Sequence, residues 1–381
     1  MVTPHQLDLK AASIQDLYQS LEQELIRLVI LRLTTKTTTE LSKDTVFQWY
    51  FEKLNDLHAL NWQTIDRIVK SNSKMTKDQL ARLIIDDGLK IADEADEEFA
   101  NLMDTNRKNW SDIDQILNGY FDQQWLDIDN HVNQTLISRN YKYNPLAQLY
   151  QQVLSDTVTK VITGLVDPKK AFRNAIYDLV KKGIKLTLTD AAGRQWTLES
   201  YVKMVLKSTT RRVFNQLRLD RATDYGIVTA LMSSHAAARE ACSQIQGGWV
   251  LTVPTNEAPL EFRTIKSIYD YGYGDPGGTQ GINCNHRLYP GIPGVTENNM
   301  PKPPTVEEAQ ANAKIIAKQR RLEVSIREAK RMLNAAKALG SQSDVTHFNV
   351  LIRNRQSALR QFIRDHEDLL HRDYSREQVY S

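Results

Sequence analysis

The stretch GYGDPGGTQGINCNHRLYPGIPGV, residues 272–295, restricts the fold of this chain more than any other part of the sequence. Glycine and proline both destabilise helical backbone, so the stretch predicts turns around a short extended piece at residues 282–289. Alternate side chains of an extended chain share a face, and we therefore expect Cys284 and His286 to point the same way. Two such soft ligands in a loop are either two of the ligands of a metal site or a contact that stabilises the loop.

Helical patterns dominate the chain before this stretch. Residues 5–180 repeat apolar residues at spacings of three and four, which predicts a series of helices. Thr76 is a candidate helix N-cap, and Asn118-Gly119 and Asn144-Pro145 are candidate breaks between helices.

The pattern changes after residue 182. Residues 183–198 alternate apolar and polar side chains around Ala191-Ala192-Gly193, which predicts a β-hairpin. A basic helix is expected at 198–221, followed by strands near 225–234 and 247–253. The predicted buried face of the basic helix consists of Tyr201, Val205, Leu206, Val213 and Leu217.

The C-terminal part begins with a proline-rich linker, ENNMPKPPT, at residues 297–305. Two helices are expected beyond it, at about 306–339 and 344–371, with Gly340 ending the first. The short connection predicts an antiparallel helical hairpin. The predicted fold is thus mainly α, with a helical N-terminal region (1–182), a small central α+β domain (183–298), and a linker with a C-terminal helical hairpin (299–381).

Length and composition limit the class of protein. The chain has 381 residues, of which 41% are hydrophobic and 25% charged, as in a soluble globular protein. No apolar run approaches the roughly 20 residues that span a bilayer, and the first residues lack the layout of a signal peptide. Two cysteines do not form a disulfide framework, which favours a reducing compartment.

The charge is distributed unevenly along the chain. Residues 1–140 contain 23 acidic and 15 basic residues, whereas residues 141–381 contain 23 acidic and 34 basic residues. A basic half can face phosphate or an acidic protein neighbour, or it can consist of solvated helix faces.

Four side chains are soft ligands that could converge: His235, Cys242, Cys284 and His286. Zinc favours four such ligands in a tetrahedron, although the spacing here is not that of a common zinc finger. Alternatively, the cysteines are small core residues and the histidines form hydrogen bonds. A metal-dependent nuclease is a third interpretation, but the segment has no clustered Asp or Glu, and the chain has no phosphate-binding loop or nucleophile elbow.

Several segments together resemble the phage minor capsid protein 2 family, which is related in role to the Mu-F-type head morphogenesis proteins. The matching segments are 196–226, SSHAAAREAC at 233–242, 271–295, 317–340 and 359–370. The chain departs from the family pattern at Ala236-Ala237 and Glu240. The basic residue expected between Cys284 and His286 is instead found at Arg287.

The resemblance implies a structural head protein with no catalytic activity. Such a protein would be assembled in the host cytoplasm into the phage head, and thus the virion. Its partners would be portal and capsid proteins, with non-specific contact to packaged DNA and no membrane. The resemblance implies no cofactor, and a structural zinc ion stays open. The alternative is a metal-dependent nuclease or toxin-like effector domain delivered with the DNA.

Overall fold

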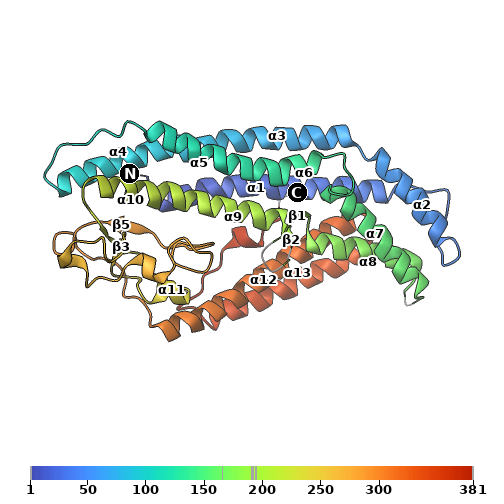
Figure 1. Ribbon diagram of the computed structural model, residues 1–381. Coiled ribbons are helices and arrows are strands. Elements are labelled where there is room, and N and C mark those ends of the chain that lie inside the picture. The colour runs from blue at the N-terminus through green and yellow to red at the C-terminus, as the bar shows by residue number, and fades with distance from the viewer. Residues whose placement is uncertain (1, 165, 190–192, 194, 380–381) are drawn as a thin grey trace. The chain divides into compact units, whose positions relative to one another are not determined.

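The computed structural model describes residues 2–164, 166–189, 193 and 195–379, and most of these residues are helical (Figure 1). This confirms the predicted mainly α fold class. The helices of the first half are α1 (Pro4–Leu33), α2 (Val46–Asp56), α3 (Trp62–Ala81), α4 (Asp87–Leu102), α5 (Ile113–Ile128), α6 (Gln134–Ile137), α7 (Pro145–Ile162) and α8 (Pro168–Lys182).

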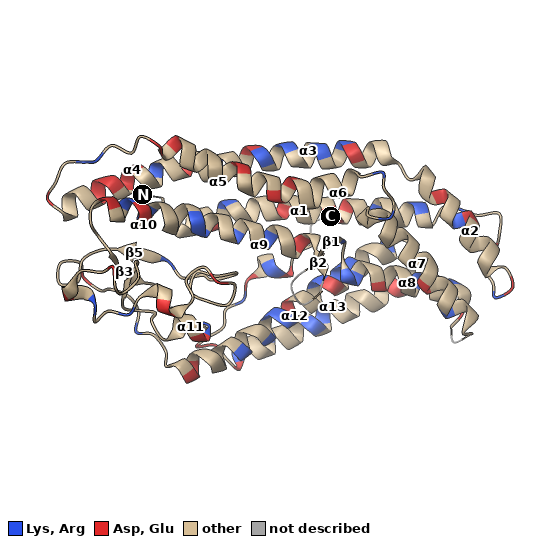
Figure 2. Ribbon diagram, viewed as in Figure 1, with Lys and Arg blue, Asp and Glu red and all other residues tan. Residues whose placement is uncertain are grey.

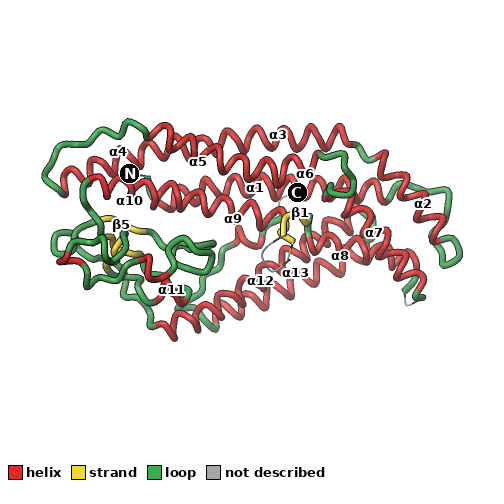
Figure 3. Tube along the Cα trace, viewed as in Figure 1, coloured by secondary structure: helices red, strands yellow, loops and turns green. Residues whose placement is uncertain are grey.

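The second half contains the strands (Figure 3). Strands β1 and β2 form the predicted antiparallel hairpin, whose turn at 190–192 and 194 lies outside the described residues. A second sheet has the order β4-β3-β5 and is antiparallel throughout, with Ala230 opposite both Val250 and Pro290. The elements are β1 (Lys185–Thr189), β2 (Gln195–Thr197), α9 (Leu198–Arg211), α10 (Leu217–Asp224), β3 (Thr229–Met232), α11 (Glu240–Ser243), β4 (Trp249–Leu251), β5 (Leu288–Pro290), α12 (Val306–Ala338) and α13 (Gln342–Arg364).

Local capping explains where some helices begin. The Asn144 side chain accepts hydrogen bonds from the backbone N–H groups of Leu146 and Ala147, so Asn144-Pro145 is a helix start as predicted. The other two predicted signals were wrong. Thr76 is buried inside α3, and Asn118-Gly119 lies within α5, because packing of a helix outweighs the weak preference of one or two residues.

The described residues form two compact units, each assembled from three separate segments of the chain. The first unit contains residues up to 14, 77–126 and 203–318, and it includes the three-stranded sheet. The second contains 15–76, 127–202 and 319–381. The domain boundaries proposed after residues 182 and 298 concern independent folding and stay predictions.

The core of the first unit around the three-stranded sheet is small and contains both cysteines. The partly buried rings of Tyr271 and Tyr273 pack against it. Its buried members are Leu219, Ala230, Met232, Ala238, Cys242, Ile245, Val250, Ile268, Cys284 and Leu288. Residues of the glycine-rich loop and of the sheet therefore share one core.

In the second unit, α13 and the part of α12 from residue 319 onward form the predicted antiparallel hairpin, with the Arg355 guanidinium donating to the Ser325 carbonyl (Figure 1). Gly340 has a φ of +65°, as expected for a glycine after a helix end. The second helix ends at Arg364 and not near residue 371, because the chain turns back. No helix in the described part of the chain is long and apolar enough to cross a membrane.

Residues 371–377, which we call the C-terminal clasp, pack back onto α12 and α13. Gln319 donates to the His371 carbonyl at 2.8 Å, and the Lys330 ammonium donates to the Glu377 carbonyl at 2.7 Å. The Glu377 carboxylate accepts from Arg372 at 2.7 Å and from Gln356 at 3.0 Å. The clasp thus replaces the last turns of the predicted helix.

Candidate metal centre

The glycine-rich loop at 272–295 is compact enough that its backbone nearly touches itself. A Cβ atom on Gly278 would lie 1.9 Å from the Gly272 carbonyl oxygen, and one on Gly281 would lie 1.9 Å from the Asp275 carbonyl oxygen. These approaches require glycine, because a side chain cannot fit there.

The predicted extended piece at 282–289 was partly wrong. The Cys284 N–H donates to the Gly281 carbonyl at 3.1 Å and closes a turn, in which Asn283 has a φ of +58°. Regular strand structure begins only at Leu288. The proximity of Cys284 to His286 therefore comes from this turn and the chain after it, not from a regular strand.

Two arginines from outside the loop hold its carbonyl groups. Arg239, just before α11, donates to the carbonyls of Pro276 at 3.0 Å and Ile282 at 2.5 Å. Arg211, at the end of α9, donates to the Gly281 carbonyl. Neither role was predicted, since an arginine that binds backbone carbonyls leaves no spacing pattern in the sequence.

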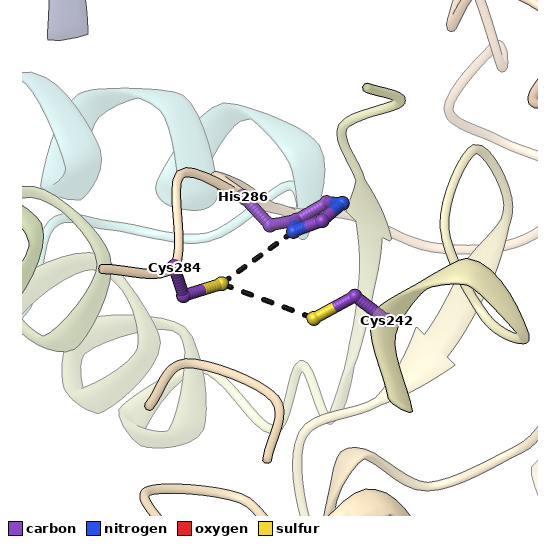
Figure 4. Close-up of side chains that lie close together, drawn as sticks. All are labelled: Cys242, Cys284 and His286. Atoms are coloured by element: carbon purple, nitrogen blue, oxygen red, sulfur yellow. Dashed lines mark hydrogen bonds between the residues drawn. The ribbon is translucent and has the colours of Figure 1, made fainter. Parts of the chain in front are cut away.

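Three of the four predicted ligands converge, and Figure 4 shows their side chains directed toward one another. The sulfur of Cys242, on α11, lies 4.0 Å from the sulfur of Cys284. The Cys284 sulfur lies 3.4 Å from Nδ1 of His286. All three side chains are buried. Within the described residues, this is the one group of at least three His, Cys, Asp or Glu side chains close enough to hold an ion.

The orientation of the His286 ring is fixed by a residue that the sequence did not reveal. Nε2 of His286 lies 3.0 Å from Oε1 of Gln246, and the same oxygen accepts the backbone N–H of His235 at 2.8 Å. Metal-bound histidines commonly donate their second ring N–H to such an acceptor. The amide of Gln246 thus favours the tautomer in which Nδ1, facing Cys284, carries the lone pair.

The fourth predicted ligand, His235, lies beside the group but is not directed into it. Its ring packs edge-on against the ring of His286, with the centroids 4.6 Å apart. Nε2 of His235 lies 3.2 Å from the Asn285 carbonyl oxygen and 3.3 Å from the Ser233 hydroxyl. These contacts of His235 therefore stabilise the segment that carries Cys284 and His286.

The electrostatics of the buried thiol pair are asymmetric. The hydrogen bond from the Cys242 thiol, with support from His286, lowers the pKa of Cys284 to about 3 despite its burial. The same contact with Cys284, together with burial, raises the pKa of Cys242. Burial and the neighbouring His286 lower the pKa of His235. The contact between the two sulfurs therefore shifts the pKa values of the two cysteines in opposite directions.

The donor set limits the chemistry of the site. Thiolate and imidazole are soft or borderline ligands that suit zinc, whereas magnesium and calcium require oxygen ligands. No Asp or Glu belongs to the described cluster, so it offers no carboxylate base beside a metal-bound water. The arrangement fits a structural site better than a nuclease centre.

The basic helix predicted at 198–221 contributes to the same unit from residue 203 onward, and its arginines differ in what they contact. Arg221 pairs with Asp96 at 2.5 Å, and Arg218 pairs with Glu98 at 2.6 Å. Both guanidinium groups are buried, so they are not available to DNA phosphate. The predicted buried face of this helix, from Tyr201 to Leu217, is confirmed.

The chain matches phage structural proteins over nearly its whole length. The profile of the family described as phage minor capsid protein 2 matches residues 2–364. A protein named "Structural protein" from Lactococcus phage LL-H is 36% identical over 371 residues, covering 97% of this chain and 99% of that protein. Another "Structural protein", from Lactococcus phage mv4, is 41% identical over 113 residues, covering 30% of this chain and 90% of that protein. No solved structure matches the chain significantly.

The matches over nearly the whole chain thus identify it as a phage structural protein. The chain belongs to the phage minor capsid protein 2 family. The resemblance inferred from the cysteine–histidine loop and the helices around it is confirmed.

Proposed function

We propose that this protein is a minor component of the phage head that binds the portal or the inner capsid surface during head assembly in the host cytoplasm. The observation that carries the proposal is the family match over residues 2–364, which includes the helices as well as the cysteine–histidine loop. The proposed role is structural and requires no catalysis.

An exposed aromatic pair on α2 supports a protein-binding role. Phe47 and Phe51 are four residues apart and therefore lie on one face of the helix. Their exposed fractions are 59% and 60%, which is high for phenylalanine. Exposed aromatic groups of this kind contribute strongly to protein interfaces, and a capsid or portal protein is the partner that the family implies.

Purified phage particles provide the first test. The protein should be present in procapsids and virions at few copies relative to the major capsid protein, as quantitative mass spectrometry would show. Absence from both particles would refute the proposed role in the head.

Co-purification with the portal protein of the same phage provides the second test. The wild-type chain should be retained by the tagged portal, and the double substitution Phe47→Ser and Phe51→Ser should weaken retention at least tenfold. Leu260→Ser is the matched control, because Leu260 is also exposed but lies in another part of the chain. Equal loss in the control, or no loss in the double variant, would exclude α2 as the contact.

Contact with packaged DNA is a finer part of the proposal, and α13 is the element that supports it. The helix contains four arginines and one aspartate (Figure 2). Arg353 and Arg360 are exposed and seven residues apart, so they lie on one face of the helix. Such a face can bind phosphate without reading the base sequence.

A further inference from the structure

We infer that Cys242, Cys284 and His286 bind a structural zinc ion, which is completed by His235 after its side chain rotates. The ion would tie the glycine-rich loop at 272–295 to α11 and to the segment after β3. This tie would hold a part of the first unit whose apolar core is small. The proposal goes beyond the structural role in the head and does not depend on it.

Two of the three distances between the donor atoms are close to those of a zinc tetrahedron, and all three donor atoms lie within 4.8 Å of one another. Zinc–sulfur bonds of about 2.3 Å and zinc–nitrogen bonds of about 2.0 Å place two sulfurs about 3.8 Å apart and a sulfur and a nitrogen about 3.5 Å apart. The corresponding distances here are 4.0 Å between Cys242 and Cys284 and 3.4 Å between Cys284 and His286. The Cys284 sulfur is therefore placed to share an ion with each of its two neighbours, and Cys242 and His286 would close around the same ion.

The surroundings also favour a ligand site over a pair of ordinary core thiols. A core cysteine needs only apolar neighbours, whereas here an imidazole nitrogen faces the sulfur and the other ring nitrogen contacts Gln246. The backbone of His235 also donates to the Gln246 side chain, which fixes that amide. This is the second layer of contacts that orients a metal-bound histidine.

Charge balance supports a divalent ion in this buried position. Binding of Zn²⁺ would form two zinc–sulfur bonds, and any proton still on Cys242 or Cys284 would pass to the solvent. Two thiolates neutralise the ion, and the neutral imidazoles add no charge. The buried complex then carries no net charge, which avoids the cost of an unpaired charge in the core.

His235 is the side chain best placed to complete the site. Buried structural zinc sites normally have four protein ligands and no bound water. The ring of His235 already contacts the ring of His286, so a side-chain rotation would direct a nitrogen to the fourth position. The rotation would exchange its contacts with the Asn285 carbonyl and the Ser233 hydroxyl for a bond to zinc.

Metal analysis of the full-length chain tests the proposal. Protein purified under reducing conditions without chelator should contain one zinc ion per chain, measured by mass spectrometry of the elements. Cys284→Ser and Cys242→Ser should each lose most of the zinc. His347→Gln is the matched control, since His347 is exposed on α13 and should leave the zinc content unchanged.

Cobalt substitution keeps the test valid if a cysteine variant fails to fold. Wild-type protein stripped of metal and loaded with Co²⁺ should show thiolate-to-cobalt charge-transfer bands and the strong visible bands of a tetrahedral site. His235→Ala should fold but bind zinc at least tenfold more weakly. Folded wild-type protein with no zinc and no thiolate–cobalt bands would refute the site, and full zinc affinity in His235→Ala would refute the fourth ligand.

Discussion

Glu22 is buried in the second unit. Its carboxylate accepts a hydrogen bond there, which opposes the free-energy cost of burying the charge. Its Oε1 accepts the Ile184 N–H at 2.7 Å, and Oε2 lies 3.7 Å from Arg331 with no hydrogen-bond partner. Arg331 makes its closer ion pair with Glu199, at 2.5 Å. Burial raises the pKa of Glu22, and the attraction of Arg331 offsets this only in part.

Glu22→Gln should therefore leave the protein at least as stable as wild type at pH 7, because the amide oxygen can still accept from Ile184. A raised pKa means that the folded state binds the proton more tightly than the unfolded state. Wild-type stability should fall, relative to the variant, as the pH rises from about 4.5 through the folded pKa of Glu22. Urea unfolding from pH 4.5 to 8 measures this difference.

Glu24→Gln is the control for this trend. A hydrogen bond from Arg27 lowers the pKa of the partly exposed Glu24, so the pH dependence of its contribution to stability should be small and opposite in sign. The burial argument would be wrong if both variants showed the same trend.

Arg221 provides a second residue-scale prediction. Its guanidinium is 2% exposed and pairs with Asp96, itself mostly buried. Arg221→Ala should cost about 3–5 kcal/mol of unfolding free energy, because it leaves the mostly buried Asp96 carboxylate without its charged partner, with the Tyr225 hydroxyl still donating to it. Arg353→Ala, at an exposed position of α13, should change stability by less than about 0.5 kcal/mol. Denaturant melts of the two variants would show the contrast, and equal costs would contradict it.

The sequence predicted the candidate site only in part. Cysteine and histidine are rare, so Cys242, Cys284 and His286 could be selected as ligands by residue type alone. Gln246, which orients His286, could not be selected, because glutamine is common and its role depends on a contact across 40 residues of chain.

At the scale of elements, the sequence predicted which segments are helical more accurately than it predicted where each helix ends. The apolar spacing that defines α12 and α9 is local, and packing then buries the side chains that the spacing places on one face. The end of α13 was predicted seven residues late, because the polar clasp contacts that stop the helix involve residues far away on α12.

The C-terminal clasp should stabilise the hairpin through Glu377. Burial alone would raise the pKa of Glu377, but hydrogen bonds from Arg372 and Gln356 and the charges around it outweigh burial and lower the pKa. Glu377→Gln should cost about 1–3 kcal/mol near pH 7, since a charged acceptor is lost among several donors.

The pH dependence of this cost has a defined sign. A lowered pKa means that the stabilisation is present above about pH 4.5 and is lost as the pH falls through the folded pKa of Glu377. Thermal melts at pH 7 and pH 4 should thus show a smaller difference between wild type and variant at the lower pH. Glu367→Gln, at an exposed position just before the clasp, should have little effect at either pH and serves as the control.

At the scale of the whole molecule, the first part of the chain is acidic and the second part is basic. Burial decides which of the basic side chains can bind a ligand. Arg218 and Arg221 are occupied by acidic partners of the first part, whereas Arg353 and Arg360 are exposed. The sequence could not separate these two sets, because periodicity describes one helix and does not reveal which distant segment packs against it.

Binding to duplex DNA should therefore depend on α13. We expect weak binding that is insensitive to base sequence and falls steeply with salt. Arg353→Gln with Arg360→Gln should reduce the affinity at low salt and the slope of its salt dependence. Lys70→Gln with Lys74→Gln removes the same charge from an exposed face of α3 and is the control in a fluorescence anisotropy titration. If both double variants reduced DNA binding equally, net charge alone, and not α13, would account for the affinity.

The self-contacting loop has a consequence for phage genetics. At Gly278 and Gly281 even a methyl group would overlap a carbonyl oxygen of the same loop. A substitution such as Gly278→Ala must open the loop, and the shift would reach Cys284 only a few residues away. Because the protein elsewhere keeps its helices, the lesion should appear as heat-sensitive plaque formation, with particles assembled at low temperature and lost at high temperature. These two codons are therefore the places to look for conditional-lethal mutations in a phage that carries this gene.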